Sequence, residues 1–255
     1  MENIFSYHAE LINHLVWRDF RLRYKRSMLG VLWSLLPPLA QLLVLVFLFR
    51  KVVPLNIDAY PAFVFSALLP WVWFSSCLTS AGGLLINNRD LVRRPNFYPS
   101  TLILVNTLSN LIHYILFLPI LVLILALYHR GLTVYVLFYP FLVIIQGVFI
   151  VALSLMIATL NVFYRDVQYM ANLGVMLLFY LTPVFYEQHV FGQKYWYVYA
   201  FNPMAVLTEG YRSIFFHGVP PNGTALLLAG GMALLLLVLG RWTYNRYLHD
   251  VIDAL

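Results

Sequence analysis

The sequence predicts an all-α membrane protein with six transmembrane helices, and two observations lead to this fold class. The 255 residues are 62% hydrophobic and 10% charged, whereas soluble domains carry about 25% charged residues. The chain also contains six uncharged windows, and each reaches the roughly 20 residues that a helix needs to cross the hydrocarbon core of a bilayer. These windows are 27–49, 59–88, 95–129, 131–164, 167–186 and 213–240.

Residues 1–26 are predicted to form an amphipathic helix that lies in the cytoplasmic membrane interface. Six apolar residues recur there at helical spacing, with polar residues largely between them: Ile4, Phe5, Leu11, Ile12, Leu15 and Val16. Five cations then follow within nine residues: Arg18, Arg21, Arg23, Lys25 and Arg26. Anionic headgroups attract such residues by about 1 kcal/mol each, so we expect the cluster at the cytoplasmic face, directly before the first span.

The rest of the chain is predicted to complete a single transmembrane domain over 1–255. Its membrane region is expected over 27–243, and 244–255 is expected to form a cytoplasmic tail. After the first span, the others are expected at about 60–83, 99–128, 134–160, 168–186 and 224–243.

A seventh uncharged stretch, 195–208, is too short to cross the membrane and contains Asn202 and Pro203. We expect it to form a re-entrant segment between the fifth and sixth helices. Because lipid cannot satisfy backbone polar groups, its backbone must be shielded by protein.

The distribution of cations predicts the orientation. Six spans put both termini on one side, and Lys and Arg residues are more abundant on the cytoplasmic side of membrane proteins. The side that holds the termini carries 11 of them, and the other side carries five: Arg50, Lys51, Arg130, Lys194 and Arg212. Both termini are therefore expected in the cytoplasm, in a multi-pass protein of the cytoplasmic (inner) membrane.

Enzyme chemistry is poorly supported. The chain has ten acidic residues, and it has neither a zinc-protease His-Glu-x-x-His helix nor a Gly-x-Ser-x-Gly nucleophile elbow. No catalytic residue, metal ligand or cofactor is predicted. Asn106, Asn110 and His113 share one helix face and are expected to face protein or water; we interpret His113 as a hydrogen-bonded packing residue. No Gly-Lys-Ser/Thr phosphate loop is present, so any ATP would be hydrolysed by another polypeptide.

Three groups of residues keep two interpretations each. The basic cluster is either a topology anchor or a phosphate site. Charged residues of the short connections are either solvated or form a docking surface for a cytoplasmic partner: Arg89, Asp90, Arg93, Arg94, Arg165 and Asp166. Aromatic residues of the outer loop form either an interfacial belt or a passage for sugars: Phe191, Tyr195, Trp196, Tyr197, Tyr199, Phe201 and Tyr211.

Four segments carry a family resemblance: RDFRLRYKRSMLGVLWSLLPPL, LNVFYRD, FYLTPVFY, and NPM with Tyr211-Arg212 downstream. Their order and spacing resemble the membrane subunit of ABC-2-type exporters of lipid-linked polysaccharide, the O-antigen and teichoic-acid permeases. The resemblance extends along nearly all of the chain.

This resemblance implies a homodimer that carries two copies of a separate ATP-binding subunit, which would bind ATP and Mg. The cargo would be an undecaprenyl-diphosphate-linked glycan, and nucleic acid is not expected as a partner. On this basis we assign the basic cluster to the lipid diphosphate and the charged connections to the ATPase interface. Six aromatic residues are assigned to the glycan path and outer gate: Tyr180, Tyr186, Tyr195, Trp196, Tyr199 and Phe201. An exporter of drugs or small lipids and a membrane-embedded glycosyl- or acyltransferase remain as alternatives.

Overall fold

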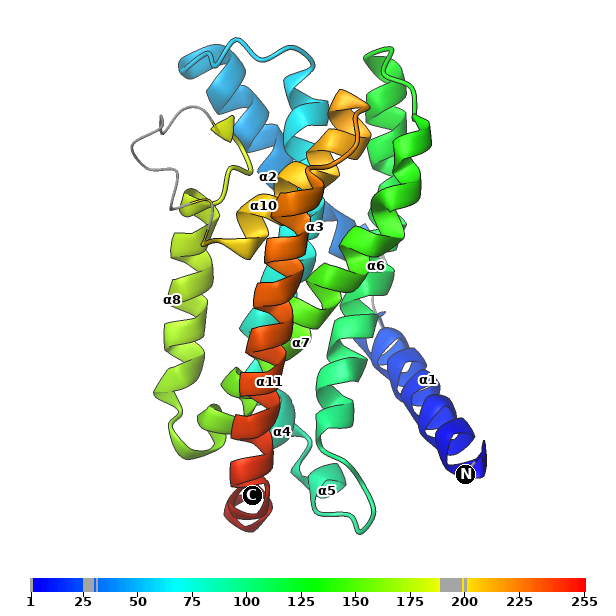
Figure 1. Ribbon diagram of the computed structural model, residues 1–255, viewed down its shortest axis with the longest axis vertical. Helices are drawn as coiled ribbons and strands as arrows, with labels where there is room; N and C mark the ends of the chain where they lie inside the picture. Colours follow the sequence, from blue (N-terminus) through cyan, green and yellow to red (C-terminus); the bar gives the residue numbers. More distant parts are fainter. Residues whose placement is uncertain (1, 25–29, 31, 189–198, 200) are drawn as a thin grey trace.

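The computed structural model describes residues 2–24, 30, 32–188, 199 and 201–255. In these residues every regular element is a helix (Figure 1), which confirms the predicted all-α class. The helices are α1 (Glu2–Tyr24), α2 (Leu32–Phe47), η1 (Leu48–Val52), α3 (Tyr60–Ala81), α4 (Gly83–Asn87), α5 (Arg89–Val92), α6 (Ser100–Leu127), η2 (Val134–Phe138), α7 (Tyr139–Phe163), α8 (Asp166–Leu181), α10 (Pro203–Arg212), η5 (Ser213–His217) and α11 (Gly223–Ala254).

Five helical stretches are long and apolar enough to cross a bilayer. They are Leu32–Val52, Tyr60–Ala81, Ser100–Leu127, Val134–Phe163 and Gly223–Ala254. Each overlaps one of the predicted spans, so five of the six predicted membrane helices are confirmed as candidate spans. The protein is a multi-pass membrane protein.

Helix α8 is shorter than the predicted fifth span, which we placed at 168–186. It has 16 residues and a length of about 24 Å at 1.5 Å per residue. The helix ends at Leu181 because Thr182 precedes a proline, and the ring of a proline pushes the preceding residue out of the helical region. Thr182 accordingly has extended backbone angles, with φ −96° and ψ 133°. The sequence reasoning missed this stop signal.

Helix α3 forms the centre of the bundle. Most of its residues are buried, and it packs against α2, α6, α7, α8 and α10. Two aromatic stacks fix its position: Trp73 lies parallel to Tyr114 of α6, and Phe74 lies parallel to Phe149 of α7. The Trp73 indole also donates a hydrogen bond to the Thr107 carbonyl at 3.1 Å. A central helix buried on all sides explains why its sequence shows no polar face.

Helices α7 and α11 pack closely along their lengths (Figure 1). At Gly240 the two backbones come so near that an added methyl group would lie 2.6 Å from the Ala152 carbonyl oxygen. Helix α11 also continues without a break through residue 243, where we expected the membrane region to end. Tyr244 and Val251 of this extension are buried against residues of α4 and α5.

The two termini lie at the same end of the bundle, together with α4, α5 and the connection between α7 and α8 (Figure 1). Helix α1 leans against α6 and slants away from the other helices. Leu15 and Val16 are buried in this contact and pack with Val105 of α6. A helix therefore lies where the amphipathic helix was expected, and it spans Glu2–Tyr24.

Candidate functional site

A short helix, α10, begins in the predicted re-entrant segment 195–208 and continues beyond it to Arg212. The Asn202 side chain caps it by accepting hydrogen bonds from the backbone N–H groups of Met204 and Ala205, at 3.1 and 3.3 Å. Pro203 occupies the first turn, where a missing N–H has no cost. Asn202 also donates to the Thr182 hydroxyl at 3.0 Å. The NPM motif thus starts a helix and ties it to the end of α8.

Helix α10 packs against α3, α7 and α11. Eight of its ten residues are buried. This agrees with the expectation that the backbone of this segment is shielded by protein. From its cap the segment rises through η5 toward the end of the bundle opposite to both termini (Figure 1).

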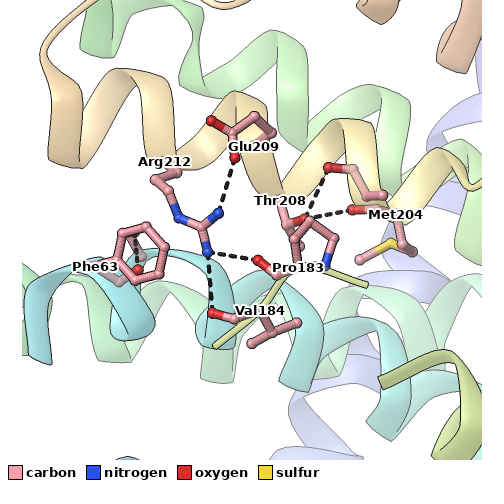
Figure 2. Close-up of polar contacts among 9 residues, drawn as sticks. Phe63, Pro183, Val184, Met204, Thr208, Glu209 and Arg212 are labelled. Carbon is pink, nitrogen blue, oxygen red and sulfur yellow. Dashed lines mark hydrogen bonds and ion pairs between the residues drawn. The ribbon is translucent and has the colours of Figure 1, made fainter. Parts of the chain in front are cut away.

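Arg212 at the end of α10 is a buried charge that holds three segments together (Figure 2). Its side chain is 1% exposed. Nη1 donates to Glu209 at 2.9 Å, and Nη2 donates to the carbonyl oxygens of Pro183 and Val184 at 2.7 and 3.1 Å. The guanidinium also lies over the ring of Phe63 in α3. Three hydrogen bonds and the contact with the Phe63 ring offset the removal of a cation from water.

The sequence prediction counted Arg212 among the solvated cations of the poorer face, and the structure places its side chain inside the protein instead. Glu209 three residues earlier was the available signal. On a helix, this spacing places a carboxylate beside a guanidinium. We call Phe63, Pro183, Val184, Glu209 and Arg212 the Arg212 latch.

The backbone after α8 is also held from α3. The Tyr60 hydroxyl donates to the Phe185 carbonyl at 2.8 Å, and the Tyr186 hydroxyl donates to the Tyr180 carbonyl at 2.9 Å. Phe185 stacks on Phe49. The FYLTPVFY segment is therefore a folded connection with several partners.

The aromatic residues predicted for the glycan path occupy different environments. Tyr186 and Tyr199 are buried at 6% and 5% exposure, whereas Tyr180 and Phe201 are exposed at 58% and 76%. Tyr195 and Trp196 lie outside the described residues. Of the described four, Tyr180 and Phe201 present their rings to the surroundings.

At the opposite end, a polar cluster joins α3, α7 and α8 at the LNVFYRD motif. Asn161 donates to the Gly82 carbonyl at 3.0 Å and accepts from the backbone N–H of Gln168 at 2.9 Å. The Gln168 side chain donates to the Thr79 carbonyl at 2.8 Å. Sequence reasoning noted the motif but missed these roles of Asn161, Gln168 and Gly82.

All six residues predicted for the ATPase interface are exposed at this same end of the bundle. Arg89 and Asp90 lie in α5, and Arg93 and Arg94 follow it. Arg165 directly precedes α8, and Asp166 is the first residue of that helix.

The residues predicted for the diphosphate site lie at the end of α1 and beyond it. Arg18 pairs with its neighbour Asp19 at 3.1 Å, and Arg21 is exposed. The backbone of Arg23 is helical. Lys25 and Arg26 lie outside the described residues.

The polar face of α6 is buried, as expected. Asn106 accepts from Ser80 at 3.0 Å and donates to the Cys77 carbonyl at 3.2 Å, and Asn110 donates back to Asn106. His113 Nδ1 lies 2.8 Å from the Ser109 carbonyl oxygen. These bonds confirm the packing interpretation of His113. Among the described residues no group of His, Cys, Asp or Glu side chains is arranged to hold a metal ion.

Comparison with known proteins identifies the family. The family model for the ABC-2 type transporter matches residues 10–216. An O-antigen export system permease protein RfbA of Klebsiella pneumoniae is 30% identical over 94% of this chain and 93% of that protein. The protein of the same name from Myxococcus xanthus is 32% identical over 93% and 92%. The polysialic acid transport protein KpsM of Escherichia coli is 22% identical over 92% of each chain.

These matches account for the missing ATP site and for the absence of enzyme motifs in the sequence, because a transport subunit needs neither. They extend along nearly the whole polypeptide, as the quoted motifs led us to expect. The chain belongs to the ABC-2 type transporter family and is a membrane permease subunit of that family.

Proposed function

We propose that this permease exports an undecaprenyl-diphosphate-linked polysaccharide, of O-antigen or teichoic-acid type, across the cytoplasmic membrane. The observation that carries the proposal is the similarity, over more than nine tenths of both chains, to O-antigen export permeases. The more distant similarity to a polysialic acid transport protein also supports a polysaccharide cargo.

In this proposal α8 is the fifth of six membrane crossings. The helix is shorter than a bilayer core, so the connection after it must complete the passage. Residues that leave a helix within hydrocarbon expose carbonyl groups, and these need partners from protein. Arg212 and Tyr60 supply such partners to Pro183, Val184 and Phe185. Together with α10, this connection would form the re-entrant outer gate.

The assembly would be a homodimer with two copies of an ATP-binding subunit. Both termini, α5 and the Arg165-Asp166 turn would face the cytoplasm, where the exposed charges could contact that subunit. The Asn161–Gln168 cluster supports this role, because it connects the turn rigidly to α3 and α7. A displacement of α5 or of the Arg165-Asp166 turn would therefore be transmitted to α3 and α7 at the centre of the bundle.

The cargo would meet two sets of residues. Arg18, Arg21, Arg23, Lys25 and Arg26 would attract the diphosphate at the inner leaflet. The glycan would then pass aromatic rings, with Tyr180 and Phe201 as the exposed described candidates and Tyr195 and Trp196 as further ones. Tyr186 and Tyr199 would support the gate from inside.

Deletion and complementation in the native host test the proposal. Cells that lack the chain should lose surface polysaccharide and accumulate lipid-linked glycan inside. The intact chain should restore export only together with an ATP-binding subunit whose phosphate-loop lysine is intact. Unchanged surface polysaccharide in the deletion strain, with altered tolerance of small amphiphiles, would instead favour the drug or lipid exporter. Turnover of a glycan by the purified chain without ATPase would favour the transferase.

A further inference from the structure

A cavity of about 340 Å³ lies between α10 and the first turns of α11, at the end of the bundle opposite to the termini. We call it the outer crevice. Its size falls at the lower end of the range for small-molecule sites, about 300–1,000 Å³. Of the described residues that the sequence analysis assigned to a site, Tyr199 alone lines it.

The walls of the outer crevice combine an apolar surface with several polar side chains. Ala205, Val206 and Leu226 supply apolar surface. The polar groups are a carboxylate, two amides and two hydroxyls: Glu209, Gln188, Asn222, Ser213 and Tyr199. Burial raises the pKa of the Tyr199 hydroxyl, so this group is uncharged and can donate and accept.

This chemistry selects for a polyhydroxylated, uncharged ligand. Carboxylates, amides and hydroxyls exchange hydrogen bonds with sugar hydroxyls, and an apolar surface accommodates the C–H face of a sugar ring. A phosphate is disfavoured, because the described lining residues include a carboxylate and no Lys or Arg. Arg212, the cation that pairs with Glu209, also donates to two carbonyl groups.

We propose that the outer crevice binds a sugar unit of the exported glycan through its hydroxyl groups. The inference rests on the proposed export function and adds a site to it. The expected ligand is a sugar of the glycan and not the glycerol of a lipid headgroup, because five polar side chains surround a chamber that is large enough for a sugar ring.

The crevice is connected to the Arg212 latch through Glu209. The carboxylate uses Oε2 to accept from Arg212, and its side chain is 36% exposed. A sugar hydroxyl that donates to Glu209 would compete with Arg212 for the same charge. Sugar binding would thereby weaken the ion pair of Arg212 with Glu209, and with it the contact that Arg212 makes between α10 and the connection after α8. Arrival of the glycan would favour opening of the gate.

Cysteine labelling of the whole transporter tests the site directly. The chain has a single cysteine, Cys77, and it is buried. In a Cys77→Ala background, Ser213→Cys places a thiol in the crevice, and Thr224→Cys places one on the exposed start of α11 outside the lining. Both are labelled from outside with a membrane-impermeant maleimide. The partner ATPase carries a substitution that stalls hydrolysis.

We expect Ser213→Cys to react several-fold more slowly in cells that make the glycan than in cells that do not. Thr224→Cys should react equally in both. In membranes from glycan-free cells, added oligosaccharide of the same glycan should restore protection, and glycerol should not. Protection by glycerol alone would overturn the assignment to sugar, and equal Ser213→Cys rates in both strains would overturn the site.

A second variant separates binding from folding. Glu209→Gln keeps the size of the side chain and can still accept from Arg212. It should reduce export about tenfold, the effect of weakening a hydrogen bond to a charged acceptor, and should abolish the glycan protection of Ser213→Cys. If the intact chain restores surface polysaccharide and Glu209→Gln changes neither readout, the crevice proposal fails while the export function stands. If the chain is not needed for surface polysaccharide, the export function itself fails.

Discussion

The guanidinium of Arg212 lies 3.8 Å above the centre of the Phe63 ring, so the last residue of α10 stacks on the central helix α3. The same group donates to Glu209 and to two carbonyl groups beyond α8. A planar guanidinium can make these hydrogen bonds and the ring contact together, because its N–H donors lie in one plane and its faces remain available for stacking. Arg212 therefore connects the gate segment, the end of α8 and the bundle centre.

Arg212→Met should destabilise the protein by about 3 kcal/mol, because it leaves the carbonyl groups of Pro183 and Val184 buried without these donors. The measurement is the midpoint of thermal unfolding in detergent. Arg130→Met is the matched control: Arg130 lies 4.0 Å over Phe216 and donates to its carbonyl, but is partly exposed. We expect it to cost about 1 kcal/mol or less. Equal losses in the two variants would contradict the special role of the Arg212 latch.

Gly240→Ala should destabilise the contact between α7 and α11. Its new methyl group would lie 2.6 Å from the Ala152 carbonyl oxygen, and a backbone atom cannot rotate away. We expect a loss of about 1–3 kcal/mol, as for other overpacked sites.

Gly231→Ala on the same helix is the control, because its new methyl group would meet no atom within 4 Å. It should stabilise the helix by about 0.5–1 kcal/mol, the usual gain of alanine over glycine. Both changes are read from thermal unfolding in detergent. A lower midpoint for Gly231→Ala than for Gly240→Ala would show that the close approach of the two helices is wrong.

Gly82→Ala should disturb the connection to the ATPase side more than it disturbs the fold. The added methyl group would lie 2.2 Å from the Gln168 Oε1 atom. That side chain is flexible and can rotate, but rotation breaks its hydrogen bond to the Thr79 carbonyl. We expect reduced stimulation of the partner's ATP hydrolysis by glycan, with a small loss of stability.

Gly174→Ala in α8, where the new methyl group meets no atom within 4 Å, should leave the stimulation unchanged. Asn161→Leu should resemble Gly82→Ala, because it removes both hydrogen bonds that Asn161 makes. Normal coupling in Gly82→Ala and Asn161→Leu would refute the view that this cluster transmits force.

The sequence predicts long membrane helices well, because hydrophobic length is a local property. The windows around residues 60–81 and 100–127 each carry their own signal. The buried face of Asn106, Asn110 and His113 was also predictable, since helical spacing of polar residues within an apolar helix is visible in one segment.

Long-range contacts were not predictable in this way. Arg212 resembles an ordinary loop cation until the fold brings it to Phe63, whose position is about 150 residues earlier. Asn161 and Gly82 likewise meet only through the packing of α3 against α7. The end of α8 at Leu181 was available from Pro183 alone, and it was missed because the apolar composition continues to Tyr186.

Charge reversal at the end of α1 tests the diphosphate assignment. Arg21→Glu combined with Arg23→Glu should abolish export while leaving the amount of inserted protein unchanged. Helix α1 is held to α6 by apolar contacts of Leu15 and Val16 with Val105, so we expect the helix to stay docked in the double variant. Arg246→Glu is the control, because Arg246 is an exposed arginine of α11 toward the same end of the bundle, and this variant should retain export.

The readouts are surface polysaccharide and binding of the purified complex to vesicles that contain polyprenyl diphosphate. Added salt should weaken this binding. Full export by the double variant would remove the diphosphate from this site and leave the cations as a topology anchor.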